Sequence, residues 1–175
     1  MRGRARHPGD NMNTPVIVAL GSNDKGAWAD IPALLEAAMV ELAGAGVVVQ
    51  ARSRWWRSAA WPDPADPAFL NGVVQGEWSG TAEALMAALS NIEDRFARRR
   101  SVRNAPRTLD LDLIDFGGQV ADGPDLILPH PRAAERLFVM GPLAEIAPDW
   151  RHPVLGVTAG ELAAEAAVGR DAVPE

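Results

Sequence analysis

The segment 108–115, with the sequence TLDLDLID, alternates polar and apolar side chains. Because successive side chains of a β-strand point to opposite faces, this alternation predicts a strand with three leucines on one face and Asp110 and Asp112 on the other. A sheet that contains this strand can bury the leucine face in a core, while the opposite face carries two carboxylates. Asp115 has the opposite parity and precedes two glycines, so we assign it to the following turn.

The remaining periodic segments complete the order strand, helix, two strands, helix, strand, with further helices appended. Runs of β-branched and aromatic residues predict the strands, and apolar spacing after a capping residue predicts the helices. The strands are expected at 16–20, 47–56, 69–78 and 108–115, and the helices after Asp30, after Thr81, from Pro131 onward, and at 143–147 and 158–167. This is the order of an α+β, ferredoxin-like fold, an antiparallel sheet with helices on one face and additional C-terminal helices.

Length and composition fit one globular domain. The chain has 175 residues, 47% hydrophobic and 23% charged, and no apolar run approaches the roughly 20 residues of a membrane-spanning helix. It has no cysteine, which excludes disulfides and thiolate metal sites and is typical of a reducing compartment. We expect a disordered extension over 1–14, a single domain over 15–168 and a tail over 169–175, in a cytoplasmic monomer or dimer without a membrane partner.

Positive charge is concentrated in one part of the chain. The formal net charge is −6, yet residues 95–107 hold six arginines and no acidic residue. A protein that coats nucleic acid or anionic lipid spreads its positive charge more widely, so one patch on an acidic body favours a small, multiply charged anion. A solvated basic helix end is the alternative, because positive charge is favourable at a helix C-terminus.

Asp110 and Asp112 are candidate metal ligands. Two residues of strand separate their Cβ atoms by roughly 6–7 Å, and like charges at this distance repel unless a cation lies between them. Mg²⁺ prefers oxygen ligands and keeps positions for water and substrate phosphates. Since the arginine run leads directly into this strand, the segment combines groups that bind a triphosphate, in a chain without a GxxxxGK[ST] motif. A plain solvent-facing strand remains the alternative.

Aromatic and amide side chains elsewhere fit a flat heteroaromatic ligand. Phe69 and Phe138 could supply two aromatic faces, and Asn71, on the same strand face as Phe69, could bind a polar edge. His130, between two prolines, could donate a hydrogen bond to a phosphate. Core packing of the aromatic residues and a structural histidine are the alternatives.

Six motifs follow one another in a fixed order, and PRTLDLD is the most specific of them. They are Gly21-Ser22-Asn23, Phe69-Leu70-Asn71, PRTLDLD at 106–112, Pro129-His130, Arg136-Leu137-Phe138 and PLAEIAP at 142–148. Between about residue 16 and residue 148 the chain therefore resembles the 6-hydroxymethyl-7,8-dihydropterin pyrophosphokinase family of folate biosynthesis.

The resemblance implies Mg²⁺-dependent transfer of pyrophosphate from ATP to 6-hydroxymethyl-7,8-dihydropterin, giving AMP and the pterin diphosphate. It implies that Asp110 and Asp112 bind two Mg²⁺ ions and that Arg98 and Arg107 also take part in catalysis. The implied ATP-binding residues are Glu93, Arg98, Arg100, Arg107, Leu113, His130 and Arg136. The implied pterin-binding residues are Gly21, Ser58, Ala59, Trp61, Phe69, Asn71 and Phe138. The loops at 58–67 and 98–106 correspond to the family's mobile lids.

Some positions depart from the family pattern, and two other functions use part of the same residues. The departures are Trp61, Asn104, Ala105, Asp125 and Pro131. A two-metal nuclease or nucleotidyl transferase would use the same carboxylates, and an RNA-binding module would use a similar sheet. The acidic body and the two carboxylates, which repel phosphate unless metals intervene, argue against a nucleic-acid partner.

Overall fold

An antiparallel sheet forms the centre of the molecule. The structure is a computed structural model, and it describes residues 13–60, 63–98 and 108–175. The strand order is β5-β1-β4-β3-β8, and β2 also pairs with β4. The strands are β1 (Thr14–Ser22), β2 (Val48–Arg52), β3 (Trp56–Ser58), β4 (Phe69–Trp78), β5 (Asp110–Phe116) and β8 (Val173–Pro174).

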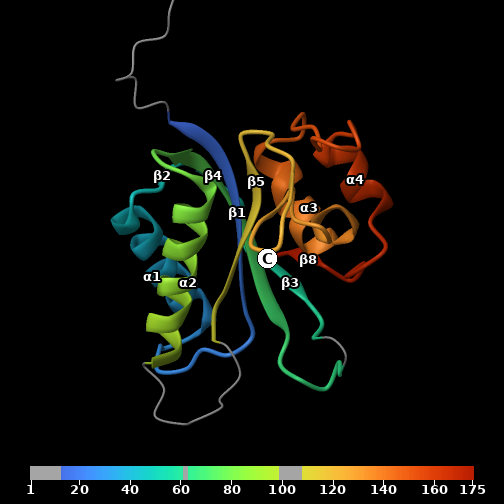
Figure 1. Cartoon of the computed structure of the whole chain (residues 1–175). Helices are drawn as coiled ribbons and strands as arrows, with labels where there is room; N and C mark the ends of the chain where they lie inside the picture. The colour runs from blue at the N-terminus through green and yellow to red at the C-terminus, as the bar shows by residue number, and fades with distance from the viewer. Residues whose placement is uncertain (1–12, 61–62, 99–107) are drawn as a thin grey trace, which may run out of the picture.

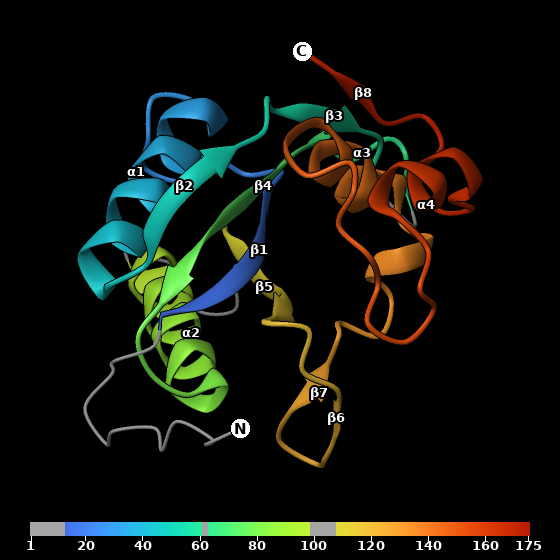
Figure 2. The same cartoon turned by 90° about the horizontal axis from the view of Figure 1, so that it is seen from above.

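Helices pack on both faces of this sheet (Figure 1). On one face lie α1 (Ile31–Ala45) and α2 (Ala82–Arg98), which share a buried core with the leucines of β5. On the other face lie the 3₁₀ turn η1 (Ala133–Glu135), α3 (Leu137–Ile146) and α4 (Ala159–Glu165), packed around Ile17, Val73 and Ile114. The ferredoxin-like prediction is therefore confirmed, and the appended helices cover part of the second face, as Figure 2 shows from above.

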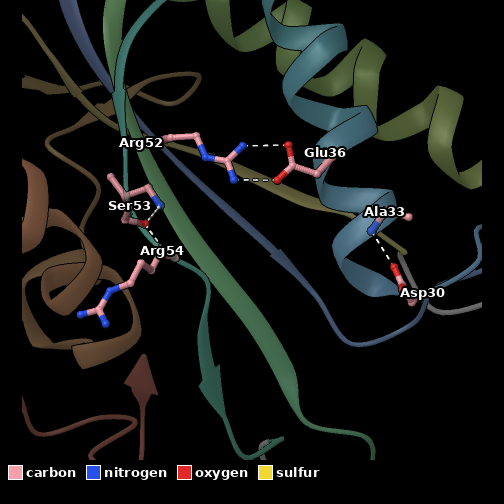
Figure 3. Close-up of polar contacts among 7 residues, drawn as sticks. Asp30, Ala33, Glu36, Arg52, Ser53 and Arg54 are labelled. Atoms are coloured by element: carbon pink, nitrogen blue, oxygen red, sulfur yellow. Dashed lines mark hydrogen bonds and ion pairs between the residues drawn. The ribbon is translucent and has the colours of Figure 1, made fainter. Parts of the chain in front are cut away.

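Local capping explains where the first two helices begin and end. The Asp30 carboxylate accepts a hydrogen bond from the Ala33 amide at 2.8 Å (Figure 3). Gly46, with φ 113°, ends α1 in the left-handed conformation. The Thr81 hydroxyl accepts from the Ala84 amide at 3.1 Å and caps α2. Both predicted N-caps are confirmed.

The strand predicted over 47–56 is interrupted in the structure. Between β2 and β3, the Ser53 hydroxyl accepts from the Val73 amide at 3.0 Å and donates to the Arg54 carbonyl at 2.7 Å (Figure 3 shows the second bond). Ahead of this break, Arg52 forms a two-pronged ion pair with Glu36 of α1, at 2.6 and 2.8 Å. The side-chain bonds of Ser53 replace part of the ladder, so the strand continues in two pieces.

The assignment of Asp115 to a turn is wrong. Asp115 lies within β5 and is only 5% exposed. Opposite Ile17 and Val18 the register skips Ile114, which forms a β-bulge, and the extra residue reverses the parity of everything that follows. Ile114 packs with α3 and α4, on the face where the alternation already places it, and the reversed parity turns Asp115 to the same face, where it hydrogen-bonds to Trp150.

The chain after α2 also differs from the sequence expectation in three places. Between residues 131 and 147, where two helical stretches are expected, the structure has the 3₁₀ turn η1 and one α-helix, α3, which contains Pro142. A small hairpin of β6 (Ala121–Asp122) and β7 (Ile127–Leu128) precedes it. Residues 169–175 are not a free tail, because β8 pairs with β3. The expected extension at 1–14 falls almost wholly outside the described residues. Within the described ranges, no helix has the length and apolar character needed to cross a bilayer.

Candidate active site

A cavity of about 230 Å³ opens on the sheet face that α3 and α4 leave partly uncovered. Its lining comes from β1, the start and end of the loop between β3 and β4, the first residues of β5, and α3. The lining residues are Ala19, Leu20, Gly21, Ser58, Ala59, Phe69, Asn71, Asp110, Asp112, Arg136, Phe138 and Val139. Six of the seven residues that the resemblance implies for the pterin therefore line one cavity, together with both carboxylates.

Asn71 is held rigidly at the floor of this cavity. Its side-chain amide donates to the Ser58 hydroxyl at 3.0 Å and to the Trp56 carbonyl at 3.4 Å, and the residue is only 7% exposed. Its carbonyl oxygen faces Gly21, where a Cβ atom would lie 3.1 Å from it. A glycine at position 21 therefore leaves room for a fixed amide whose oxygen lies beside the cavity.

Phe69 and Phe138 approach the cavity from opposite elements. Phe69 begins β4, Phe138 lies in the first turn of α3, and both are partly buried. The Arg136 guanidinium carbon lies 5.7 Å from the centre of the Phe138 ring, within the range of a cation–π contact. The site thus combines two aromatic side chains with one cation at its edge.

Asp110 and Asp112 lie at the end of β5 that borders the cavity. In the register of the sheet, Asp110 is opposite Gly21 and Asp112 is opposite Ala19 of β1. The Asp112 side chain is 48% exposed, and one of its carboxylate oxygens lies 3.9 Å from His130 Nε2. The structure therefore places both carboxylates on the cavity face, as the alternation predicts.

Asp112 also borders a second cavity of about 430 Å³, on the α2 side of β5. The β6–β7 hairpin and the start of the segment leading to η1 form the opposite wall. The lining residues are Met86, Leu89, Ser90, Glu93, Leu111, Asp112, Leu113, Pro124, Asp125, Leu126, Ile127, His130 and Pro131. Three of the implied ATP-binding residues, Glu93, Leu113 and His130, meet here, whereas Arg136 lines the first cavity.

Glu93 links α2 to the carboxylate strand. Its side-chain oxygen accepts a hydrogen bond at 2.8 Å from the amide of Leu111, the residue between the two aspartates. This bond fixes the backbone on which Asp110 and Asp112 are carried.

His130 is held in an orientation that directs Nε2 toward Asp112. Its amide donates to the Ile114 carbonyl at 2.9 Å, and its Nδ1 accepts from the Arg132 amide at 3.2 Å. Because Nδ1 accepts, the neutral ring carries its proton on Nε2. Burial lowers the pKa of His130, although the nearby Asp112 carboxylate acts in the opposite direction. The lowered pKa favours the neutral form of the ring.

The carboxylate pair fits a magnesium site that is completed by other ligands. Both side chains offer only oxygen atoms, and Asp112 is accessible from both cavities. Among the described residues, no group of three or more histidine or acidic side chains is arranged to hold a metal. Mg²⁺ suits such a sparse donor set, because it retains waters and shares its coordination sphere with substrate phosphates.

Several implied residues cannot be placed. Trp61, Arg100 and Arg107 lie outside the described residues, as do Asn104 and Ala105, and Arg98 ends α2 without a described side chain. Arg95, the first arginine of the run, pairs with Glu41 of α1 at 2.8 Å. The sequence did not indicate the β6–β7 hairpin as a wall of the second cavity, although Gly123-Pro124 is a turn signal.

The fold and the two cavities define a class of protein, an α+β domain with a small-molecule site built from aromatic rings and paired carboxylates. Residues 17–148 match the model of the 7,8-dihydro-6-hydroxymethylpterin-pyrophosphokinase (HPPK) family, and the chain belongs to this family.

Individual relatives agree with this membership. The chain is 44% identical to a 2-amino-4-hydroxy-6-hydroxymethyldihydropteridine pyrophosphokinase of Synechocystis over 71% of its own length and 64% of that protein's. It is 37% identical to the protein of the same name from Methylorubrum extorquens, over 78% of this chain and 84% of that protein. Its fold is similar to that of the Plasmodium falciparum HPPK-DHPS crystallised with pteroate, at a TM-score of 0.65 and 12% identity, over 87% of this chain and 42% of that one.

Proposed function

We propose that this protein transfers the pyrophosphoryl group of ATP to the hydroxymethyl group of 6-hydroxymethyl-7,8-dihydropterin, with Mg²⁺, and releases AMP. The observation that carries the proposal is the position of Asp112 between two cavities. One cavity holds the aromatic and amide side chains suited to a pterin, and the other holds Glu93, Leu113 and His130. A nucleotide in the second cavity would extend its phosphates past the carboxylates toward an alcohol in the first.

The first cavity supports binding of a flat, polar bicyclic ring. Phe69 and Phe138 would lie against its two faces, and the oxygen of Asn71 would accept a hydrogen bond from a ring N–H group. Since Ser58 and Trp56 already hold the Asn71 amide nitrogen, the oxygen is presented without further loss of side-chain freedom.

The second cavity supports binding of the nucleotide. The apolar side chains of Leu111, Leu113 and Leu126 offer contact area for a base, and Nε2–H of neutral His130 would donate to a phosphate oxygen. Arg136, at the edge of the first cavity, would pair with the phosphates that approach the alcohol.

In the reaction, the hydroxymethyl oxygen attacks the β-phosphorus and the bond from this phosphorus to the α–β bridging oxygen breaks. The alcohol proton passes to solvent, the bridging oxygen leaves with AMP, and the β- and γ-phosphates become the diphosphate of the pterin. Mg²⁺ held by Asp110, Asp112 and the phosphates would supply charge neutralisation and in-line alignment. Glu93 holds the backbone between the two aspartates, which keeps their spacing fixed.

The test is incubation with ATP, Mg²⁺ and the hydroxymethyl dihydropterin, followed by separation of the nucleotides. We expect AMP and the pterin diphosphate, whereas ADP would indicate an ordinary kinase and an unchanged nucleotide would contradict the proposal.

Asp110→Asn and Asp112→Asn should reduce turnover by at least about a thousandfold without altering the far-UV spectrum or the unfolding midpoint. Near wild-type turnover in either variant would exclude the two-carboxylate metal site.

A matched control is available in the β6–β7 hairpin. Asp122 is an exposed aspartate in β6 that lines neither cavity. Asp122→Asn removes the same charge from the same surface region, so it should leave turnover unchanged.

A further inference from the structure

Residues 167–175 lie beyond the segment that matches the family model, yet they contact both walls of the first cavity. On the α3 wall, the Val168 amide donates to the Glu135 carbonyl at 2.9 Å, and the Leu137 amide donates to the Val168 carbonyl at 2.9 Å. On the opposite wall, β8 pairs with β3, and the Glu175 amide donates to the Trp55 carbonyl at 2.9 Å. One short segment therefore bridges the two elements that carry Phe138 and Ser58.

Gly169 is the point of contact with Phe138. Its φ of +68° lies in the left-handed region, and a Cβ atom built on it would overlap Cδ1 of the Phe138 ring and lie 3.0 Å from Cε1. Only glycine combines this conformation with so close an approach of the backbone to the ring. The backbone of Gly169 thus lies directly against the Phe138 ring and limits the movement of the ring toward this segment.

Asp171 is the point of contact with the loop after β3. Its carboxylate accepts a hydrogen bond from the Ala59 amide at 2.5 Å. Ala59 and Ser58 both line the cavity. Because the Ala59 amide is bound to Asp171, this end of the loop is held at a fixed distance from α3.

We propose that the segment 168–175 sets the width of the pterin cavity, with Gly169 positioning Phe138 and Asp171 positioning Ala59. Both are positioning residues, since neither lines the cavity itself. The inference rests on the proposed function, because it assigns the cavity to the pterin. It predicts that changes in this segment alter the affinity for the pterin while leaving the use of ATP unchanged.

Gly169→Ala tests the first contact, and Gly156→Ala is its matched control. Gly156 has the same φ of +68°, but nothing lies within 4 Å of a Cβ at that position. The two substitutions therefore introduce the same backbone strain, and only the first also displaces the Phe138 ring. We expect Gly169→Ala to raise the KM and the Kd for the pterin by about tenfold, relative to Gly156→Ala, with the KM for ATP unchanged.

Asp171→Ala tests the second contact independently. It removes the acceptor of the Ala59 amide, whereas Asp171→Asn retains an acceptor oxygen, so the pterin KM should rise several-fold in the first variant and recover in the second. Arg170→Ala is the control, because Arg170 is exposed and makes no hydrogen bond or ion pair within the described part of the chain. If Gly169→Ala does not fold, the comparison of the pterin KM between Asp171→Ala and Asp171→Asn tests the proposal on its own.

The wild-type protein is measured first, by AMP formation and by calorimetric titration with the pterin alone. Absence of both AMP formation and pterin binding in the wild type overturns the proposed function and this inference together. AMP formation by the wild type, with the same pterin KM in Gly169→Ala and Asp171→Ala as in their controls, overturns this inference alone. A lower unfolding midpoint without a change in the pterin KM also overturns it, since that result reflects stability only.

Discussion

Asp115 shows how one residue can be placed by a backbone irregularity rather than by its neighbours in sequence. One of its carboxylate oxygens accepts from the Trp150 indole and from the Gly118 amide, both at 3.3 Å, while the other is buried without a hydrogen-bond partner among the described residues. Burial raises the pKa of Asp115, and it lowers the pKa of the neighbouring His152. Keeping this buried carboxylate ionised at neutral pH lowers the stability of the folded state. Its hydrogen bond with Trp150 joins β5 to the chain after α3.

Asp115→Asn is expected to change how stability depends on pH. Because the folded pKa of Asp115 is raised, the folded state holds the proton more tightly than the unfolded chain does, and wild-type stability is lost as pH rises from the unfolded value of 3.8 through the raised value. Asparagine keeps an acceptor for Trp150 and cannot ionise. The free energy of unfolding of the variant, relative to wild type, should therefore be higher at about pH 7 than at about pH 4.

Urea unfolding of both proteins at the two pH values measures this difference. His152 titrates in both proteins, so most of its contribution cancels in the comparison. An equal difference at both pH values would show that Asp115 is ionised in the folded state with an ordinary pKa.

At the scale of elements, Glu145 of α3 holds the break between β2 and β3. Its carboxylate accepts from the Arg54 amide and from Arg54 Nε, both at 3.0 Å, and from the Trp56 indole at 2.9 Å. The Trp56 ring in turn occupies the space beside Gly141 of α3, where a Cβ atom would overlap it. The break in the strand is thus fixed by a helix far away in the sequence.

Glu145→Ala should lower the free energy of unfolding by about 1–2 kcal/mol, since three donors lose their acceptor. Glu145→Gln keeps one acceptor oxygen, so its free energy of unfolding should lie between those of Glu145→Ala and the wild type. Glu165→Ala, at the exposed end of α4, serves as the control and should change stability little. Chemical unfolding followed by tryptophan fluorescence measures all three, and an unchanged midpoint in Glu145→Ala would mean that the packing of Trp56 alone holds the break.

The strands and helices of this fold also show which features the sequence could predict and which it could not. The alternation at 108–115 was sufficient to place Asp110 and Asp112 on one face, because that information is local. The capping residues Asp30 and Thr81 likewise marked their helices. The bulge at Ile114, the break at Ser53 and the pairing of β8 with β3 depend on partners distant in sequence, so periodicity within one segment could not reveal them.

In the candidate site, the same distinction separates what was predicted from what was missed. The motifs grouped Phe69, Asn71 and Phe138 as residues of one predicted ligand and assigned His130 to another, and in the structure the first three line one cavity and His130 lines the other. The hydrogen bond from Leu111 to Glu93 and the contacts of Gly169 and Asp171 were not predicted, because they arise only when separate elements pack together.

At the scale of the whole molecule, the sheet separates two faces with different roles. The helices α1 and α2 lie on one face of the sheet and share one core with it, whereas α3 and α4 lie on the other face (Figure 1). They cover that face only in part and leave room for the first cavity. The carboxylates of β5 lie on the open face and its leucines on the covered one. The alternating segment therefore contributes to stability and to the site at once.

The charge of the molecule favours a small phosphate ligand over nucleic acid. The chain has a net charge of −6, Asp110 and Asp112 border the open cavity, and Arg95 is already paired with Glu41. A DNA duplex would place many phosphates against this acidic surface, whereas one nucleotide can be bound by a few cations. We expect binding of a labelled duplex to be weaker than about 100 µM near physiological salt, by fluorescence anisotropy with and without Mg²⁺. Titration with ATP and Mg²⁺ is the positive control, and micromolar duplex binding that weakens steeply with salt would instead favour a metal-dependent nuclease.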